Sequence, residues 1–315
     1  MMLKVGVLGA GNSGEIHLNT WKEVDQTQVE GFYETSDSIA EYTKDTFSVN
    51  RFPDVDYLIE ACDLIDITTP DDDCFEWCEK AIRKGKHVFV EKTLANSIEE
   101  AKQLVKLIKE SNVKFQVGYA ERFNPAYAVL QSLSPKPVFI EAKNMIPADQ
   151  KNENQNLLFG LMASDIDIIL SIAKSEVKNI SAISASVISD TDDMINARIE
   201  FNNGCVANIT WGHLSVSPVH QMLFYEPGKF ISMDLINKKT LIIDQENLHD
   251  IKIVESDNIK TGENNIYKKN DPVKLQLEEF RNAVLNNTTP LVSAIDGLRA
   301  MEIAYKILQK TKYTC

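Results

Sequence analysis

The stretch 4-KVGVLGAGNSGEIH-17 decides the fold of the first part of the chain. Its apolar run 4–10 predicts a buried strand, and Gly9, Gly11 and Gly14 give the spacing G-x-G-x-x-G where a helix can begin. These glycines allow a tight turn, close approach of a ligand to the backbone, and close packing of helix on strand. A strand before the glycines and a helix after them therefore predict a dinucleotide-binding loop, with phosphates at the helix N-terminus.

An acidic residue supports this interpretation and selects the cofactor. Glu34 ends the next predicted strand, 29–34, 20 residues after Gly14. A carboxylate at this place accepts hydrogen bonds from the adenosine ribose. The segment 33-YETSDS-38 holds no Arg or Lys for a 2′-phosphate, so we expect NAD, with NADP less favoured. The loop and its acid give the first predicted cofactor-binding residues: Gly9, Gly11, Asn12, Ser13, Gly14 and Glu34.

Strand and helix patterns divide the chain into two predicted domains. Up to about residue 120, short apolar runs alternate with amphipathic stretches, which predicts βαβ units and a doubly wound parallel Rossmann sheet. Further along, 196–211 has the pattern of a β-hairpin, with its turn at Asn202–Gly204. We therefore expect an α/β fold with a dinucleotide-binding domain at 1–120 and a second domain at 121–315, whose last helix packs on the first. The remaining predicted elements are strands at 64–70, 87–92, 114–119, 229–235 and 239–244, helices at 72–84, 98–111, 157–173, 273–287 and 294–311, and a mobile loop at 255–272.

Composition excludes several functional classes. The chain has 315 residues, 43% hydrophobic and 25% charged, and a net charge of −13, which argues against a nucleic-acid partner because phosphates need a clustered basic surface. No apolar run approaches the roughly 18 residues of a membrane span, so we expect no membrane partner and a cytoplasmic protein. The odd number of cysteines and the lack of a zinc-like spacing predict free thiols and no metal site. These cysteines are Cys62, Cys74, Cys78, Cys205 and Cys315.

Four sequence blocks carry a resemblance to a known family. Besides the glycine loop, they are 68-TTP-70, 81-AIRKGKHVFVEKT-93 and 118-GYAERFNPA-126. With the antiparallel second half, this combination resembles the Gfo/Idh/MocA family, named for glucose–fructose oxidoreductase, inositol dehydrogenase and a rhizopine-catabolism protein. The resemblance covers essentially the whole chain, and 85-GKHVFVEK-92 is its most specific part. The blocks 118–126 and 164–182 are most similar to the branch near nucleotide-sugar dehydrogenases.

The resemblance implies a fold and an activity. Family members join a Rossmann domain to an α/β domain with a large open, mainly antiparallel sheet, which often forms oligomer contacts. They transfer hydride between NAD(P) and a hydroxyl carbon of a sugar, an inositol or a nucleotide sugar. We therefore expect a small sugar-type substrate and a homo-oligomer, a dimer or a tetramer. Thr69, Pro70, Glu91 and Lys92 are added to the cofactor site, and Lys92 would also take the hydroxyl proton and stabilise the alkoxide.

The sequence departs from the family pattern around the expected active site. Gly160 and Ser164 stand where the family has an Asp and a His on one helical face. Three further positions differ: Thr93 replaces a proline, and Tyr119 and Cys74 each replace a histidine. The chain could therefore be a working oxidoreductase or a catalytically impaired NAD-binding member with a binding, sensing or partner role.

Among the surviving residues, Asp167 lies on the Gly160/Ser164 face of the predicted helix and is the second predicted catalytic residue beside Lys92. Asp165 is either a substrate contact or an acceptor for backbone N–H groups. Arg122 either bridges the domains or holds a substrate phosphate. Tyr119 and Ser164 are weaker substrate candidates. The remaining histidines include His17, which could contact cofactor or substrate, and His213 and His220, expected at the surface or a sheet edge, from which they could still reach a ligand.

Overall fold

The computed structural model describes residues 2–69, 74–91, 93–147, 156–189, 191–244, 252–255 and 271–311. Pro70, Lys92, Cys315 and most of the loop predicted at 255–272 lie outside these residues. The chain divides into two compact units, and each is described by itself. The first unit contains residues 1–120 and 271–299, and the second contains 121–270 and 300–315. The segment 271–299 thus returns to the first unit after the whole second sheet.

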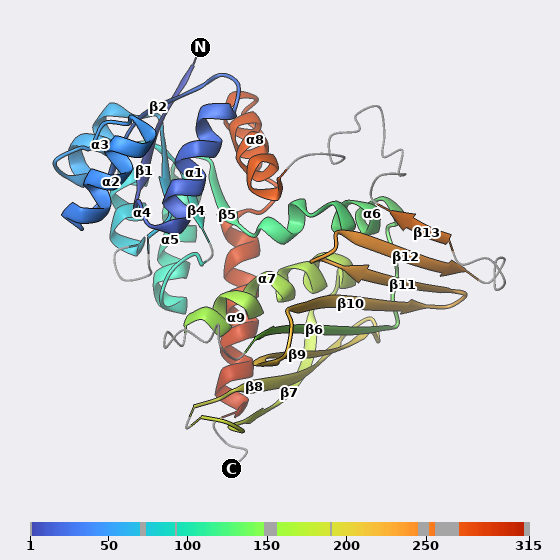
Figure 1. Cartoon of the computed structure of the whole chain (residues 1–315). Helices are drawn as coiled ribbons and strands as arrows, with labels where there is room; N and C mark the ends of the chain where they lie inside the picture. Colours follow the sequence, from blue (N-terminus) through green and yellow to red (C-terminus); the bar gives the residue numbers. More distant parts are fainter. Residues whose placement is uncertain are drawn as a thin grey trace. The chain divides into compact units, whose positions relative to one another are not determined.

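The first unit is a five-stranded parallel sheet with strand order β2-β1-β3-β4-β5. The order reverses between β1 and β3, and in such sheets ligands bind at the carboxyl ends of the strands beside this switch point. The predicted Rossmann sheet is therefore confirmed. Its elements are β1 (Leu3–Leu8), α1 (Asn12–Glu23), β2 (Thr27–Tyr33), α2 (Asp37–Phe47), α3 (Val55–Ala61), β3 (Leu64–Ile67), α4 (Cys74–Arg83), β4 (His87–Glu91), α5 (Ile98–Glu110), β5 (Phe115–Gly118), α8 (Pro272–Leu285) and the start of α9 (Ala294–Thr311) (Figure 1).

The core of this unit needs residues from both ends of the sequence. Trp21 of α1 and Phe89 of β4 are fully buried in one hydrophobic cluster together with Leu277 and Phe280 of α8. The helices α1 and α8 pack against each other. The Gln116 side chain of β5 also donates a hydrogen bond of 3.1 Å to a backbone oxygen of α8, that of Gln276. Helix α8 is therefore an integral part of the Rossmann unit.

The second unit is built on an eight-stranded sheet with strand order β13-β12-β11-β10-β6-β9-β8-β7. All neighbouring strands are antiparallel except β6 and β9, which pair in parallel. The predicted mainly antiparallel sheet is therefore confirmed. The elements are η2 (Ala120–Phe123), α6 (Pro125–Leu133), β6 (Phe139–Pro147), α7 (Asn156–Ala173), β7 (Val177–Ala185), β8 (Met194–Phe201), β9 (Val206–Ser215), β10 (Val219–Glu226), β11 (Lys229–Asp234), β12 (Lys239–Asp244), β13 (Lys252–Glu255) and the rest of α9.

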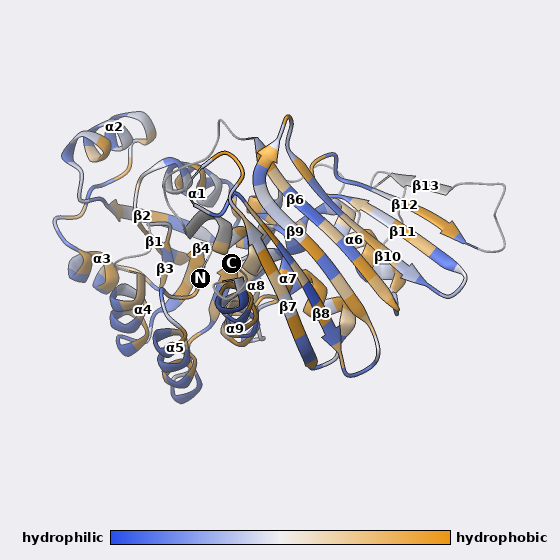
Figure 2. Ribbon diagram, turned by 90° about the horizontal axis from the view of Figure 1, so that it is seen from below, coloured by the Kyte–Doolittle hydropathy of each residue, from blue (hydrophilic) through white to orange (hydrophobic). Residues whose placement is uncertain are grey.

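One face of this sheet is apolar and the other is largely polar. Ala207, Ile209 and Trp211 of β9 are completely buried, and α7 packs on β9. Their neighbours on the other face alternate with them, and Figure 2 shows this alternation of hydrophobic and hydrophilic residues along β6 to β9. Within the described ranges, no helix has the length and apolar character that crossing a membrane requires. The sheet therefore has one apolar face, on which α7 packs.

Candidate functional site

The glycine loop of the first unit has the geometry of a phosphate cradle. Gly9 has φ +97°, and a Cβ there would lie 2.5 Å from Thr69 Cγ2, so any other residue is strained and clashes. A Cβ at Gly14 would lie 2.1 Å from the carbonyl oxygen of Gly9, so helix α1 can pack this close only with glycine. At Gly11, by contrast, no described atom lies within 4 Å of a built Cβ. The open space is therefore on the side where a ligand would approach.

Helix α1 begins at this loop with unpaired backbone donors. Gly11 is its N-cap and supplies no side-chain hydrogen bond, and Asn12 is exposed while Ser13 is half-buried. The first N–H groups of a helix have no partner within the helix and, together with the helix dipole, favour an anion. A diphosphate group fits this end of the helix without any basic side chain.

The segment after β3 lies directly against the glycine loop. Thr68 Oγ1 donates hydrogen bonds to the carbonyl oxygens of Leu8 (3.2 Å) and Gly9 (3.0 Å). The hydroxyl oxygen of Thr69 is buried and has no hydrogen-bond partner within the described part of the chain. A buried hydroxyl is costly without a partner. The orphaned Thr69 group is therefore consistent with a ligand that binds at this point.

Glu34 lies where the sequence places it, and its carboxylate is held in position. Oε2 accepts a hydrogen bond from the backbone N–H of Ala10 (2.9 Å), and Oε1 accepts one from the N–H of Ser36 (2.9 Å). The structure also brings an arginine close, which the sequence did not indicate. Arg51 Nη2 donates to the carbonyl oxygen of Glu34 (3.0 Å) and pairs with Asp37 Oδ1 at 2.7 Å. The guanidinium thus already has a carboxylate partner.

A buried charge network links helix α1 to the end of β4. Asp66 of β3 is completely buried, and its Oδ2 lies 2.8 Å from His17 Nδ1 and accepts a hydrogen bond of 2.6 Å from Trp21 Nε1. The other ring nitrogen of His17, Nε2, lies 3.4 Å from Glu91 Oε2. Burial opposes the charged ring, but Asp66 and Glu91 outweigh it and raise the pKa of His17 to about 10. His17 therefore contacts the residue before Lys92 as a cation.

Glu91 also needs the glycine at the end of β5. A Cβ at Gly118 would lie 2.4 Å from Glu91 Oε2, so the carboxylate occupies the space that a side chain would take. The next residue along, Tyr119, is almost fully buried. The sequence suggested His17 only as a cofactor or substrate contact. Its partners Asp66 and Glu91 lie 49 and 74 residues away in the sequence, so no local pattern predicted these contacts.

In the second unit, Asp167 is paired with an arginine. Arg122 Nε lies 2.8 Å from Asp167 Oδ2, and the side chains are 9% and 4% exposed. The guanidinium also contacts Tyr127, both through a hydrogen bond to its hydroxyl and above its ring, 5.4 Å from the centroid. The Tyr127 hydroxyl lies 3.0 Å from Ser171 Oγ of α7. Arg122 and Asp167, which the sequence predicted separately, thus form one buried ion pair.

Asp165 has three side-chain partners, where the sequence suggested backbone N–H groups. Trp211 Nε1 and Asn144 Nδ2 donate hydrogen bonds to its Oδ2, at 2.8 and 3.0 Å. Its Oδ1 lies 2.6 Å from His220 Nε2. Asp165 has no exposed surface, whereas the His220 side chain is 13% exposed. A histidine expected at the surface or a sheet edge is therefore bound to the acid at the centre of α7.

The two positions that depart from the family pattern differ in the space around them. A Cβ at Gly160 would meet no described atom within 4 Å. Ser164 is only 5% exposed, and its hydroxyl donates to the carbonyl oxygen of Leu161 at 3.2 Å within the helix. Position 160 therefore has room for a side chain, whereas a larger residue at position 164 must displace its neighbours.

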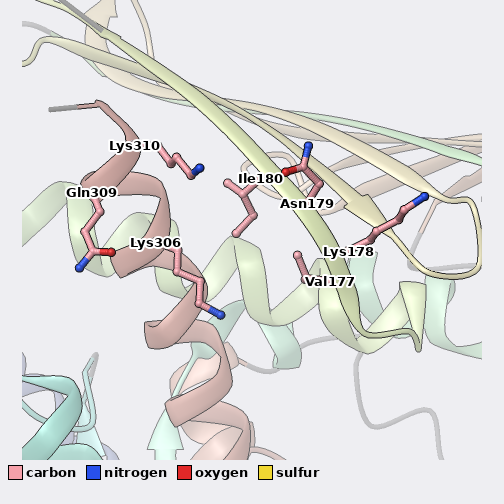
Figure 3. A pocket seen from close by; sticks show the side chains of 7 residues that line it. All are labelled: Val177, Lys178, Asn179, Ile180, Lys306, Gln309 and Lys310. Carbon is pink, nitrogen blue, oxygen red and sulfur yellow. The ribbon is translucent and has the colours of Figure 1, made fainter. Parts of the chain in front are cut away.

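A separate hollow in the second unit contains none of these residues. It has a volume of about 360 Å³ and lies between the edge strand β7 and the last turns of α9, with Lys306 and Lys310 on its helix side (Figure 3). Its other lining residues are Val177, Lys178, Asn179, Ile180 and Gln309. None of the described lining residues has a carboxylate, thiol or imidazole, so they offer cations but no acid–base pair for catalysis.

The fold and the loop define the class of protein. A parallel sheet with its glycine loop, uncapped helix and oriented acid at the switch point is a dinucleotide-binding Rossmann unit. Residues 3–119 match the model of the "Oxidoreductase family, NAD-binding Rossmann fold", GFO_IDH_MocA. Residues 3–119 therefore belong to the NAD-binding part of the Gfo/Idh/MocA family of oxidoreductases, as the sequence motifs in this part of the chain predicted.

Similar proteins cover the chain from end to end. UDP-N-acetylglucosamine 3-dehydrogenase of Acidithiobacillus ferrooxidans is 24% identical over 308 residues, which are 97% of this chain and 96% of the relative. The scyllo-inositol 2-dehydrogenase (NAD(+)) of Bacillus subtilis is 25% identical over 287 residues, 84% of this chain and 78% of the relative. These relatives favour an oxidoreductase over an impaired family member.

Solved structures show the same fold in both units. The structure of the Acidithiobacillus ferrooxidans UDP-N-acetylglucosamine 3-dehydrogenase superposes with a TM-score of 0.90 at 23% identity, covering 99% of this chain and 98% of the other. Levoglucosan dehydrogenase in complex with NADH gives 0.86 at 17% identity, with 99% and 97% covered. At these identities the likeness establishes the fold.

Proposed function

We propose that the protein is an NAD-dependent dehydrogenase that oxidises a hydroxyl carbon of a sugar or nucleotide sugar. The observation that carries the proposal is the cradle of the first unit, where open space at Gly11 and the uncapped start of α1 meet the oriented carboxylate of Glu34. The end-to-end likeness to a UDP-N-acetylglucosamine dehydrogenase supports the substrate class. In this proposal the first unit binds the cofactor, and the second binds the substrate and forms the oligomer.

The proposed chemistry assigns each residue a different task. Bound NAD would supply the hydride acceptor. Lys92, as the resemblance implies, would take the hydroxyl proton and hold the developing alkoxide. The ion pair between Arg122 and Asp167 supports a positioning role for Asp167, because its carboxylate is already paired with a guanidinium. Glu91, bound to His17, would fix the end of β4 from which Lys92 follows.

The cofactor preference follows from the charges around Glu34. A 2′-phosphate would meet the Glu34 carboxylate, whereas ribose hydroxyls would donate to it. Arg51 is the cation nearest in the described contacts, but it is already paired with Asp37. We therefore propose NAD as the cofactor. Equal or tighter binding of NADP than of NAD in a titration with both would contradict the assignment of Glu34.

The open face of the second sheet supports an oligomer. Phe139, Tyr225 and Phe230 form an aromatic cluster with centroid distances of 5.6 and 5.1 Å, and they alternate with the buried residues of β6, β10 and β11. The three side chains are half-buried on an otherwise largely polar face, and aromatic residues are enriched in protein–protein interfaces. We propose a cytoplasmic homo-oligomer, a dimer or a tetramer, assembled through this face. A purely monomeric mass by light scattering at micromolar concentration would contradict it.

Turnover of a substrate panel tests the proposed activity. The protein is mixed with NAD and, in separate reactions, with UDP-N-acetylglucosamine, other nucleotide sugars, free sugars and inositols, and the absorbance of NADH is followed. We expect turnover of at least one nucleotide sugar or sugar. A protein that binds NAD but turns over no member of the panel would support the impaired family member instead, because positions 160 and 164 lack the usual acid–base pair.

A further inference from the structure

Three neighbouring strands of the second sheet direct one side chain each to the same carboxylate. Trp211 of β9 is the register partner of Asn144 of β6, which is the register partner of His220 of β10. All three side chains reach Asp165 of α7, at 2.8, 3.0 and 2.6 Å. A buried carboxylate normally needs such partners. However, tryptophan and asparagine only donate hydrogen bonds to it, whereas histidine can also exchange a proton.

The geometry fixes which nitrogen of His220 is available. Nε2 lies 2.6 Å from the acceptor Asp165 Oδ1, so it carries the hydrogen. The Asn144 amide donates to Asp165 Oδ2, and its 3.3 Å approach to Nε2 is then a contact between two donors. In the neutral ring, Nδ1 is therefore an acceptor. It has no hydrogen-bond partner among the residues that the structure describes, and the side chain is 13% exposed. A carboxylate that orients one nitrogen and leaves the other without a protein partner is the arrangement of a general base.

No other described histidine has this combination. His17 is enclosed between Asp66 and Glu91 and is only 1% exposed. His87 has no carboxylate within ion-pair distance among the described residues, and its Nδ1 accepts a hydrogen bond from the N–H of Lys114. His213 is 3% exposed, which leaves little surface for a substrate. Among the four histidines that the structure describes, His220 alone combines an acidic partner with a partly exposed side chain.

The charges around His220 all have the same sign. Burial opposes its charged form, but Asp165 outweighs this, with Glu121 of η2 and Asp234 of β11 adding to the effect, so the pKa of His220 lies above its ordinary value. Asn144, from the adjacent strand β6, adds no charge. These charges therefore favour the protonated form of the ring.

We propose that His220, held by Asp165, exchanges the proton of the substrate hydroxyl and so replaces the imidazole missing at position 164. The assignment rests on the proposed function. During oxidation, the hydroxyl O–H bond breaks and its proton goes to Nδ1 of His220. The C–H bond on the same carbon breaks with its electron pair going to NAD, and a C=O bond forms. The reverse reaction returns the proton from His220.

The first measurement follows the ring itself and needs no turnover. In protein with isotope-labelled histidines, NMR titration gives the pKa of each imidazole, and the His220→Gln variant assigns the signal. We expect the pKa of His220 to lie above 6.5 in the wild type. It should fall in Asp165→Asn, because this change removes the negative charge that attracts the charged ring most strongly. Addition of UDP-N-acetylglucosamine should shift the His220 signal and leave that of His87 unchanged.

The second measurement compares kinetics with this pKa. The kcat/KM for oxidation should rise with pH through the value found by NMR, since the base must be unprotonated. His220→Gln, whose amide still donates to Asp165, should lower kcat by about 10²–10⁴-fold and remove this rise, with NAD affinity unchanged. His87→Gln serves as the control and should keep the wild-type profile.

Several results would overturn the assignment. Wild-type kcat and pH profile in a folded His220→Gln protein would show that the cluster only fastens α7 to the sheet. If that variant does not fold, the wild type still gives a test. A kinetic pKa that differs from the pKa of His220 measured by NMR would show that His220 is not the base. A wild type that turns over no sugar overturns the proposed function. Turnover that His220→Gln does not change overturns only the assignment of His220, so the two failures can be told apart.

Discussion

The network around Asp66 gives a quantitative prediction for Asp66→Asn. This change keeps the size of the side chain and removes the charge beside His17, at 2.8 Å. The pKa of His17 is raised to about 10, so its contribution to stability is fully present below the unfolded value of 6.5 and is lost as the pH rises through 10. Proton linkage with these two values gives roughly 4 kcal/mol at pH 7 and roughly 1–2 kcal/mol at pH 9. The wild-type free energy of unfolding should therefore fall by about 2–3 kcal/mol between these pH values.

In Asp66→Asn, most of this pH dependence should disappear, and the protein should lose about 3–5 kcal/mol at pH 7 because a buried pair is broken. The assay is guanidinium unfolding at both pH values, followed by circular dichroism and by the fluorescence of the three tryptophans, one of which, Trp21, is bound to Asp66 through its indole N–H. Asp37→Asn is the matched control: its carboxylate is exposed, and an exposed ion pair contributes little. A wild type with level stability from pH 7 to pH 9, or an Asp66→Asn protein with the wild-type slope, would refute the reasoning.

Two further changes test the catalytic assignments. Lys92→Ala should abolish turnover and leave NAD affinity nearly unchanged, since the glycine loop is intact; a large loss of NAD binding in a titration would argue against a purely chemical role. If His220 does not replace the imidazole missing at position 164, the double change Gly160→Asp with Ser164→His should raise kcat on a sugar substrate by up to about 10²–10⁴-fold. Position 160 has open space for the new side chain. A folded double mutant with an unchanged kcat would therefore show that the absence of the Asp/His pair does not limit the reaction.

Features encoded by neighbouring residues could be predicted from the sequence. The glycine loop is local: strand, turn and helix start follow within 4–17, and their spacing alone indicates the cradle. Glu34 follows because it ends the next strand. The network around Asp165 could not be predicted in this way, because its partners lie 21, 46 and 55 residues away. They meet only through the register of three strands.

The same difference explains Asp167 and Arg51. Helical spacing placed Asp167 on the Gly160/Ser164 face, but it gave no sign that Arg122, from a segment before β6, would pair with it. The segment after β2 gave no sign of Arg51, because this residue lies 17 positions beyond Glu34 in the sequence. A β-bridge between Phe32 and Arg51 brings it close to Glu34. Both cases depend on tertiary pairing, which a periodic pattern does not encode.

The return of α8 to the Rossmann unit has a consequence for synthesis on the ribosome. Leu277 and Phe280 complete the core that Trp21 and Phe89 begin, yet the 150 residues of 121–270 are made in between. Ribosomes add about 5–20 residues per second, so roughly 8–30 s pass between the synthesis of the N-terminal sheet and that of helix α8. During this interval the apolar surface that α8 will cover is open to chaperones and to other chains. A fragment that ends at residue 120 should therefore aggregate, whatever its affinity for NAD.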